Sequence, residues 1–282
     1  MAMFGLGLLI AMLVYIVGGS LVFSEAYANY NDTSRRLQPP SAEHPFGTDE
    51  IGRDILARTI YGGQISLIIG VLAVLLSITI GTAIGMLSGY YGGLVDAVLM
   101  RITEAILSVP TLLLLLVMAK FFGGRIPDIQ VLGRQFSGSV VVIILIVGLT
   151  SWTYLARLVR STFLSLREQE FVLAARAVGA RNGHIILGHI LPNAAAPILV
   201  SATLGVAAAI LTEAYISFLG LGVQPPTATW GSMMQGATGA ITRGQWWLWF
   251  FPGLLIVLTV LSVNFLGDGL RDALDPRSDK KI

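Results

Sequence analysis

The chain has 282 residues, of which 55% are hydrophobic and 12% are charged, and its mean hydropathy is +0.78. Soluble domains carry about 25% charged residues, so this composition excludes an ordinary soluble protein and indicates a membrane protein. The net charge of +2 gives no basic surface of the kind that binds nucleic acid. The sequence has no cysteine, which excludes disulfides and cysteine nucleophiles.

A helix that spans a membrane needs about 20 mostly apolar residues, because each adds about 1.5 Å along a hydrocarbon core about 30 Å thick. Six uncharged runs approach or exceed this length, at residues 1–23, 61–91, 105–119, 136–156, 190–212 and 244–267. We therefore expect an all-α membrane protein with six transmembrane helices in one domain, 1–282. The third run is short and contains Pro110, so its helix should begin a turn or two earlier.

The first run has a second interpretation as a signal peptide, because Ala26-Tyr27-Ala28 has the small-residue pattern of a cleavage site. The apolar run is long for a signal peptide, and no Lys or Arg precedes it. We therefore interpret residues 1–23 as the first span.

Six spans place both termini on one side of the membrane. Lys and Arg are slightly more numerous near the ends of the spans on that side, which predicts cytoplasmic termini. The polar segment 24–63 is then extracytoplasmic, and residues 64–277 form a five-helix core. The loop 157–192, between the fourth and fifth spans, faces the cytoplasm.

This loop begins with the pattern of a helix start. Ser165 and Glu168 have the spacing of a capping box, so a helix should begin at Ser165. One apolar stripe of mostly small side chains follows on that helix, made of Phe171, Ala174, Ala175 and Val178. Small side chains allow another surface to approach closely.

The end of this helix and a second helix are also predicted. Gly179 stands where a left-handed residue would end the first helix. A second helix should run from Asn182, as its N-cap, to Leu191, where Pro192 ends it. The result is a protruding helix-turn-helix, and the alternative is a helix pair that lies on the membrane. A helix-turn-helix that reads DNA is disfavoured by its position between two spans.

Four strings occur in order along the chain: HPFGTDEIGRD at 44–54, EFVLAARAVGARNGHIILGHILPNAAAPI at 170–198, FLGLGVQPP at 218–226 and GDGLRDALDPR at 267–277. Together they resemble the signatures of ABC importer permeases, in the branch that carries dipeptides, oligopeptides and nickel. The second string resembles the EAA loop of these permeases. The Glu that names this loop is replaced here by Leu173.

The resemblance implies a permease subunit of an ATP-driven importer for di- or oligopeptides, with nickel or another small solute as the alternative. It implies a second homologous permease, two ABC ATPase subunits and an extracytoplasmic substrate-binding protein as partners, besides membrane lipid. The chain itself would hold no cofactor, and the ATPases would bind ATP and magnesium. None of its three lysines follows a glycine, which excludes a Walker A loop. The implied location is a bacterial or archaeal cytoplasmic membrane.

In such a permease the loop acts as a coupling helix that docks on a separate ATPase. The residues that the resemblance assigns to this contact are Glu168, Glu170, Leu173, Ala174, Ala175, Arg176, Gly179, Ala180, Arg181, His184, Ile190, Leu191 and Pro192.

Two polar loops, 24–63 and 220–243, are expected to meet the binding protein. The candidate contact residues are His44, Gly47, Asp49, Arg53, Gln224 and Pro225. The alternative is that the loops cover the lumen and bind no partner.

Charged residues near the membrane are candidates for function, because charges are costly at bilayer depth. Glu213 falls near the outer interface, either as a hydrogen-bonded residue of the rim or as part of a translocation path. Arg101 and Glu104 have the spacing of a local ion pair. His184 and His189, five residues apart, should face different sides of a helix, so we expect no metal site.

Two other classes of function are less well supported. An ion-driven secondary transporter needs ionisable groups near the midplane of the bilayer, and an intramembrane enzyme needs a nucleophile with a base. The sequence shows neither an H-E-x-x-H motif nor a Ser, His and acid arrangement, so we expect no catalytic residue.

Overall fold

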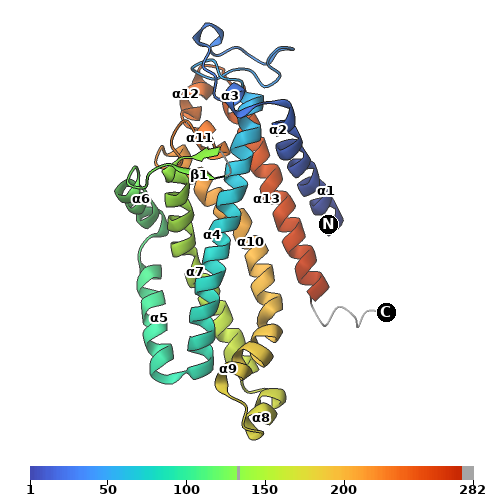
Figure 1. The fold of residues 1–282 in the computed structure, drawn as a ribbon, viewed down its shortest axis with the longest axis vertical. Coiled ribbons are helices and arrows are strands. Elements are labelled where there is room, and N and C mark those ends of the chain that lie inside the picture. The colour runs from blue at the N-terminus through green and yellow to red at the C-terminus, as the bar shows by residue number, and fades with distance from the viewer. Residues whose placement is uncertain (132–133, 275–282) are drawn as a thin grey trace.

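The computed structural model describes residues 1–131 and 134–274 of the chain. Long helices run side by side along one axis (Figure 1), which confirms an all-α membrane protein. The helix α8 (Glu170–Ala177) lies at one end of the molecule, here called the α8 end. The short helices α3 (Glu25–Ala28), α11 (Trp230–Met233) and α12 (Ala237–Thr242) lie at the opposite end, here called the loop end.

Within the described residues, five helices are long and apolar enough to cross a membrane. They are Ala2–Val22, Ile55–Tyr91, Gly138–Leu166, Asn182–Phe218 and Trp247–Leu274. The first consists of α1 (Ala2–Leu13), a π-helical turn (Val14–Gly18) and α2 (Gly19–Val22), and the second, third and fifth are α4, α7 and α13. The fourth consists of α9 (Asn182–His184), a π-helical turn (Ile185–Ile190) and α10 (Leu191–Phe218).

The expected third span is not a straight helix. It is a pair, α5 (Gly93–Ser108) and α6 (Thr111–Phe122), bent by 85° at the break, so the chain has six spans only if this pair counts as one. The break lies at Val109 and Pro110. Proline has no N–H for a helical hydrogen bond, and it forces the preceding residue into an extended conformation, as at Val109 with ψ 129°.

The helix α4 starts inside the segment 24–63, six residues before its apolar run. The side chain of Asp54 accepts a hydrogen bond from the backbone N–H of Ala57 at 2.8 Å and caps the helix at Ile55. The polar segment of the loop end therefore reaches only to Asp54. It includes α3 and a single 3₁₀ turn, Thr33–Arg35.

The glycines of α4 allow close contact with α7. A Cβ atom added at Gly85 would lie 2.6 Å from the carbonyl oxygen of Ala156, and one at Gly89 would lie 2.6 Å from Cβ of Phe163. Small residues at such positions let two helix backbones approach within a membrane.

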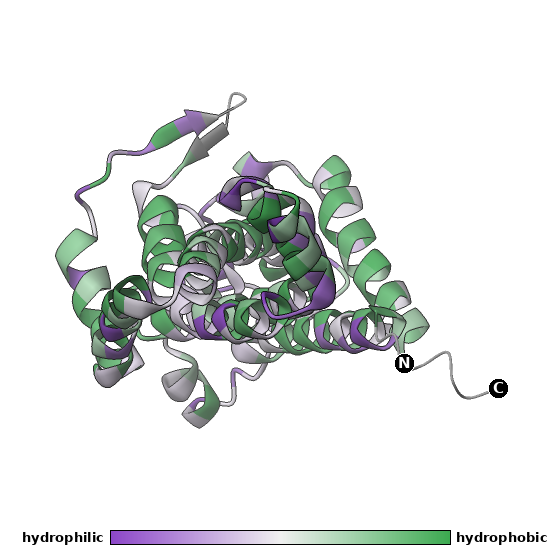
Figure 2. Cartoon of the chain, turned by 90° about the horizontal axis from the view of Figure 1, so that it is seen from below, coloured by the Kyte–Doolittle hydropathy of each residue, from purple (hydrophilic) through white to green (hydrophobic). Residues whose placement is uncertain are grey.

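The outside of the bundle is also largely apolar, as the hydropathy colours of the ribbon show from the α8 end in Figure 2. Leu21, Leu72, Leu113 and Val257 are among many exposed large apolar residues on the spanning helices. A soluble monomer seldom exposes such a surface, and lipid is the solvent that suits it. A small antiparallel hairpin, β1 (Ile129–Val131) and β2 (Arg134–Phe136), joins α6 to α7 near the loop end.

The end of the expected core, residues 275–277, lies outside the described residues. The last described helix, α13, ends at Leu274.

Candidate functional site

The helix α8 starts five residues later than the capping box predicted. The helix α7 continues through Ser165 to Leu166, so Ser165 is not a helix start. The carboxylate of Glu168 accepts a hydrogen bond from Nε of Arg167 at 2.9 Å. The N-cap of α8 is Gln169, whose side chain makes no capping hydrogen bond.

The end of α8 confirms the role predicted for Gly179. Gly179 has φ +80°, and the backbone N–H of Ala180 donates to the carbonyl of Ala175 at 3.0 Å, which closes the last turn. A Cβ atom at Gly179 would meet no atom within 4 Å, so the backbone conformation alone favours glycine here.

The second helix of the predicted pair does not end at Pro192. The N-cap is Arg181 instead of Asn182, and the helix continues through the π-helical turn Ile185–Ile190 into α10. Pro192 falls in the first turn of α10, where its missing N–H is tolerated because the wider turn before it has already changed the hydrogen-bond pattern. Between α7 and this helix, only residues 167–181 of the expected loop 157–192 remain.

The π-helical turn also changes the relation between two histidines. The ring centroids of His184 and His189 lie 5.2 Å apart, with planes at 90°, so the prediction that they face different sides was wrong. A π-helix has an i to i+5 hydrogen bond, so residues five apart approach each other. Among the described residues no group of three or more potential ligands could hold a metal ion.

One side of α8 is buried against the bundle. Val172 has no exposed surface, and it belongs to an apolar cluster with α4, α7 and α10. The other members of this cluster are Tyr90, Leu155, Val159, Phe163, Ile185, Ile186, Ile190, Ala194 and Ile198. These contacts hold α8 in place at the α8 end.

The other side of α8 exposes apolar side chains. Phe171 is 39% exposed, Leu173 is 48% exposed and Val178 is 85% exposed. These three residues are here called the exposed face of α8. Of the other candidates in this region, Glu168, Glu170, Ala174, Arg176, Gly179, Arg181, His184 and Pro192 are exposed, Ala175, Ala180 and Leu191 are half-buried, and Ile190 is buried.

Polar contacts join α8 and its neighbours to the end of α4. The hydroxyl of Tyr90 donates to Oδ1 of Asn182 at 2.8 Å, and the guanidinium of Arg176 lies 5.5 Å from the centroid of the Tyr90 ring. Nη1 of Arg167 donates to the carbonyl oxygen of Gly89 at 3.1 Å. The position of α8 is therefore linked directly to α4.

An ion pair that the sequence did not reveal joins α5 to α7 beside these contacts. Arg160 donates from Nε to Oδ1 of Asp96 at 2.5 Å and from Nη2 to Oδ2 at 2.6 Å. The hydroxyl of Ser88 donates to the same carboxylate. The two charged residues are 64 positions apart, so no local pattern could have paired them.

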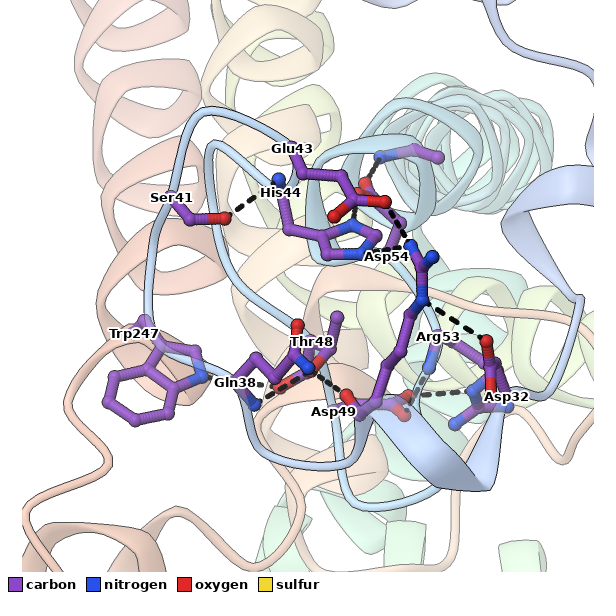
Figure 3. Close-up of polar contacts among 12 residues, drawn as sticks. Asp32, Gln38, Ser41, Glu43, His44, Thr48, Asp49, Arg53, Asp54 and Trp247 are labelled. Atoms are coloured by element: carbon purple, nitrogen blue, oxygen red, sulfur yellow. Dashed lines mark hydrogen bonds and ion pairs between the residues drawn. The ribbon is translucent and has the colours of Figure 1, made fainter.

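At the opposite end, the segment before α4 folds around buried polar residues (Figure 3). Nδ1 of His44 lies 2.8 Å from Oδ2 of Asp54, and both residues are buried. Nε1 of Trp247 donates to the carbonyl oxygen of Thr48 at 3.2 Å. His44, a candidate residue for contact with the binding protein, is therefore part of the internal structure of this segment.

The candidate contact residues of the loop end differ in exposure. His44 and Gly47 are buried, Asp49 and Arg53 are half-buried and paired with each other at 2.6 Å, and Gln224 and Pro225 are exposed. A Cβ atom at Gly47, where φ is +76°, would lie 2.6 Å from the carbonyl oxygen of Gln38. Contact with a partner remains a prediction, and only the exposed members offer side chains for it.

Local charges also order the outer rim of this segment. Arg35 pairs with Glu43, and its Nε lies 3.3 Å from Oδ2 of Asp32. A hydrogen bond from the hydroxyl of Ser34 holds the pKa of the Asp32 carboxyl below its ordinary value. Asp32 thus stays ionised beside Arg35 under ordinary conditions.

Glu213 is hydrogen-bonded, as one reading of the sequence proposed, but it is completely buried instead of lying at a wetted rim. Ser217 donates to Oε1 at 2.7 Å, and Ser66 of α4 donates to Oε2 at 3.3 Å. In this conformation the carboxylate contacts the interior of the chain, and a role in a translocation path stays a prediction.

The predicted pair of Arg101 and Glu104 is confirmed, with Nη1 and Oε2 at 3.5 Å. Both side chains are mostly exposed, so the pair contributes little to stability.

Comparison with known proteins gives consistent matches over the length of the chain. Residues 81–280 match the family described as binding-protein-dependent transport system inner membrane component. The dipeptide transport system permease protein DppC of Alkalihalophilus pseudofirmus is 43% identical over 98% of this chain and 86% of the relative. The oligopeptide transport system permease protein OppC of Bacillus subtilis is 40% identical over 97% of this chain and 85% of the relative.

Solved structures share the fold. An inward-facing structure of the MetNI methionine ABC transporter aligns with a TM-score of 0.58 at 19% identity, over 76% of this chain and 94% of the other. An amino acid ABC transporter with histidines aligns with a TM-score of 0.51 at 18% identity, over 76% of this chain and 93% of the other.

Proposed function

The chain belongs to the family of binding-protein-dependent transport system inner membrane components, and we propose that it is a permease subunit that admits short peptides to the cell. Dipeptide and oligopeptide permeases are its relatives at 40% identity or more, which supports peptides as the cargo. Nickel or another small solute remains the alternative cargo, and an ion-driven transporter is the alternative mechanism.

In the complete importer the chain pairs with a second, similar permease, two ABC ATPases and an extracytoplasmic binding protein. The α8 end faces the cytoplasm and the loop end faces outward. The two permeases together enclose the path of the peptide. ATP and magnesium are bound by the ATPases, which close on each other and so move α8.

The observation that carries this proposal is the exposed face of α8. Phe171, Leu173 and Val178 hold apolar surface in water unless another protein covers them. The groove of an ATPase that accepts an apolar helix face would cover them. Leu173, in place of the Glu of the motif, adds to the apolar area instead of supplying an ion pair.

Force that reaches α8 can pass on to the spans because α8 is held by several contacts. Val172 is packed in the cluster between α4, α7 and α10, and Asn182 accepts a hydrogen bond from Tyr90. A flexible linker at this place could not transmit displacement. The structure of this end therefore suits a coupling element.

The direct test is uptake by the reconstituted importer. The chain is produced with the neighbouring permease, ATPase and binding-protein genes, and the complex is placed in proteoliposomes. We expect accumulation of radiolabelled dialanine that needs ATP, needs the binding protein and persists when ionophores dissipate ion gradients. Uptake driven by an ion gradient without ATP, or uptake of nickel and of no peptide, would contradict the proposal.

A variant at Gly179 tests the coupling role. Gly179→Pro forbids the φ of +80° that orients the end of α8, so we expect complexes that still hydrolyse ATP but import little dialanine. Gly183→Ala is the control on the same surface, because a Cβ atom there meets no atom within 4 Å and its φ is not positive. Normal uptake by Gly179→Pro would exclude α8 as the coupling element.

A further inference from the structure

A pocket of about 400 Å³ opens at the loop end. Its walls come from the segment before α4, from the first turn of α4 and from the region of α11 and α12, and they include Asp49, Glu50, Arg53, Arg58 and Gln235. Pockets of about 300 to 1,000 Å³ with a few polar groups are typical of small-ligand sites.

Arg58 is the unusual member of this wall. It is only 5% exposed, yet its guanidinium has no carboxylate within hydrogen-bond distance among the described residues. Nη1 donates to Oδ1 of Asn29 at 3.0 Å, and Nε lies 3.8 Å from Oδ2 of Asp49. A guanidinium offers five N–H donors, and these two contacts use only part of them.

Asp49 is a more distant ion-pair partner of Arg58, at 3.8 Å, because its carboxylate makes its short hydrogen bonds elsewhere. Oδ2 accepts from Nε of Arg53 at 2.6 Å, and Oδ1 accepts from the backbone N–H groups of Ile51 and Arg53 at 3.0 Å each. The other carboxylate of the wall, Glu50, lies 3.3 Å from Nη2 of Arg243. The wall of the pocket thus holds two carboxylates, Asp49 and Glu50, and two guanidiniums, and Arg58 has a longer ion pair with Asp49 than Arg53 has.

A ligand with a carboxylate would complete this arrangement. A buried charge is costly unless it is paired, and a guanidinium binds a carboxylate through two parallel hydrogen bonds. We propose that this pocket receives the C-terminal carboxylate of a short peptide at Arg58, as the peptide enters the importer from outside. The proposal rests on the proposed function, and it adds a recognition site on the permease itself.

The carboxamide of Gln235 and the acidic residues of the wall suit the rest of such a ligand. Gln235 can bond a peptide amide, and Asp49 or Glu50 can attract an N-terminal ammonium at a short distance from Arg58. A dipeptide carries both charges within one molecule of this size. The wall is thus matched to a zwitterion better than to a metal cation or to an uncharged solute.

The test measures binding of dialanine and of its C-terminal amide to the complete importer in nanodiscs, without the binding protein, by isothermal titration calorimetry. We expect the amide to bind about ten to a hundred times more weakly, because it lacks the charge that pairs with Arg58. Arg58→Gln should lower the affinity for dialanine by a similar factor, whereas Arg125→Gln should leave this affinity unchanged. Arg125 is an exposed arginine outside the pocket.

The comparison of dialanine with its C-terminal amide uses the unchanged chain, so it remains valid even if Arg58→Gln fails to fold. The melting temperature of each complex shows whether the variant has folded. Equal affinities for acid and amide, undetectable binding of dialanine, or unchanged binding by a folded Arg58→Gln complex would overturn the site. If any of these outcomes is found while the importer still takes up dialanine in the presence of ATP and the binding protein, the proposed function stands and only the proposed pocket is wrong. Absence of any peptide uptake would overturn both.

Discussion

The hydroxyl of Tyr90 donates a 2.8 Å hydrogen bond to Oδ1 of Asn182, a residue 92 positions further along the chain. Tyr90 is in the last turn of α4, and Asn182 is the first residue of the helix that continues into α10. Two long helices are thus joined beside α8, at the place where we propose that force enters. Arg176 of α8 contacts this junction, because its guanidinium lies 5.5 Å from the centroid of the Tyr90 ring.

Removal of this bond should weaken coupling more than stability. We expect Tyr90→Phe to keep the buried ring and to lose about 1 kcal/mol of stability, with more ATP hydrolysed for each dialanine imported. Tyr91→Phe is the control, because Tyr91 is on the same helix and half of its surface is exposed. The measurement is the ratio of ATP hydrolysed to dialanine imported in proteoliposomes. An equal ratio in both variants would refute a coupling role for the bond.

A charge on the exposed face of α8 should prevent assembly. We expect Val178→Asp to leave insertion and folding intact, because this side chain is 85% exposed, and to abolish copurification of the ATPase. An aspartate buried in an apolar groove has no partner there and costs several kcal/mol. Ile241→Asp is the matched control, since Ile241 is also exposed but lies in α12 at the loop end. Equal recovery of ATPase with both variants would contradict the docking surface.

The ion pair of Asp96 and Arg160 should act as one unit. In a double-mutant cycle of Asp96→Asn and Arg160→Gln, we expect a coupling energy of about 1 to 2 kcal/mol, because the bidentate bonds are charge-assisted but partly exposed. The measurement is thermal unfolding of the purified permease in detergent at low salt. Additive effects of the two substitutions would show that the pair contributes nothing.

Close approach of α11 to α10 should make Gly231 intolerant of substitution. A Cβ atom there would lie 2.4 Å from Cα of Ala214, and a backbone atom cannot turn away as a side chain can. We expect Gly231→Ala to lower stability by about 1 to 3 kcal/mol. Gly7→Ala is the control, because a Cβ atom at Gly7 meets no atom within 4 Å and alanine favours a helix. A melting temperature lowered equally by both variants would refute the steric account.

Composition and apolar runs were sufficient to predict the five long spanning helices, though not the bend in the expected third span, because burial in lipid requires long stretches without charge. The left-handed Gly179 was also predictable, since few residues other than glycine adopt that conformation. The π-helical turn at Ile185–Ile190 was not, and it reversed two predictions: the helix end at Pro192 and the separation of the two histidines. Alternative hydrogen-bond patterns of a helix leave little trace in the order of residue types.

Long-range polar contacts of the candidate site were equally hidden. No local pattern in the sequence pairs Asp96 with Arg160, and the capping box at Ser165 misled because burial against α4 extends α7 past it. Local propensity describes a segment in isolation, whereas tertiary contact decides which of two compatible conformations persists.

The last prediction concerns the buried carboxylate of Glu213. It joins Ser66 of α4 and Ser217 of α10, and these hydroxyls in turn accept hydrogen bonds from the backbone N–H groups of Trp230 and Val223. Glu213→Ala would remove the acceptor and leave buried hydroxyls unpaired. We expect the free energy of unfolding to fall by about 2 to 5 kcal/mol. Amide hydrogen exchange in residues 219–233 should become faster.

Glu213→Gln separates the loss of charge from the loss of an acceptor. The glutamine has nearly the same volume and keeps one carbonyl oxygen, and the hydroxyl that faces its NH₂ group can turn to accept. We therefore expect a smaller loss of stability than in Glu213→Ala, with exchange in residues 219–233 close to that of the unchanged chain. If Glu213→Ala has an unchanged melting temperature and unchanged exchange, the carboxylate does not hold the loop end on α10. That result would favour a role of Glu213 in the translocation path instead.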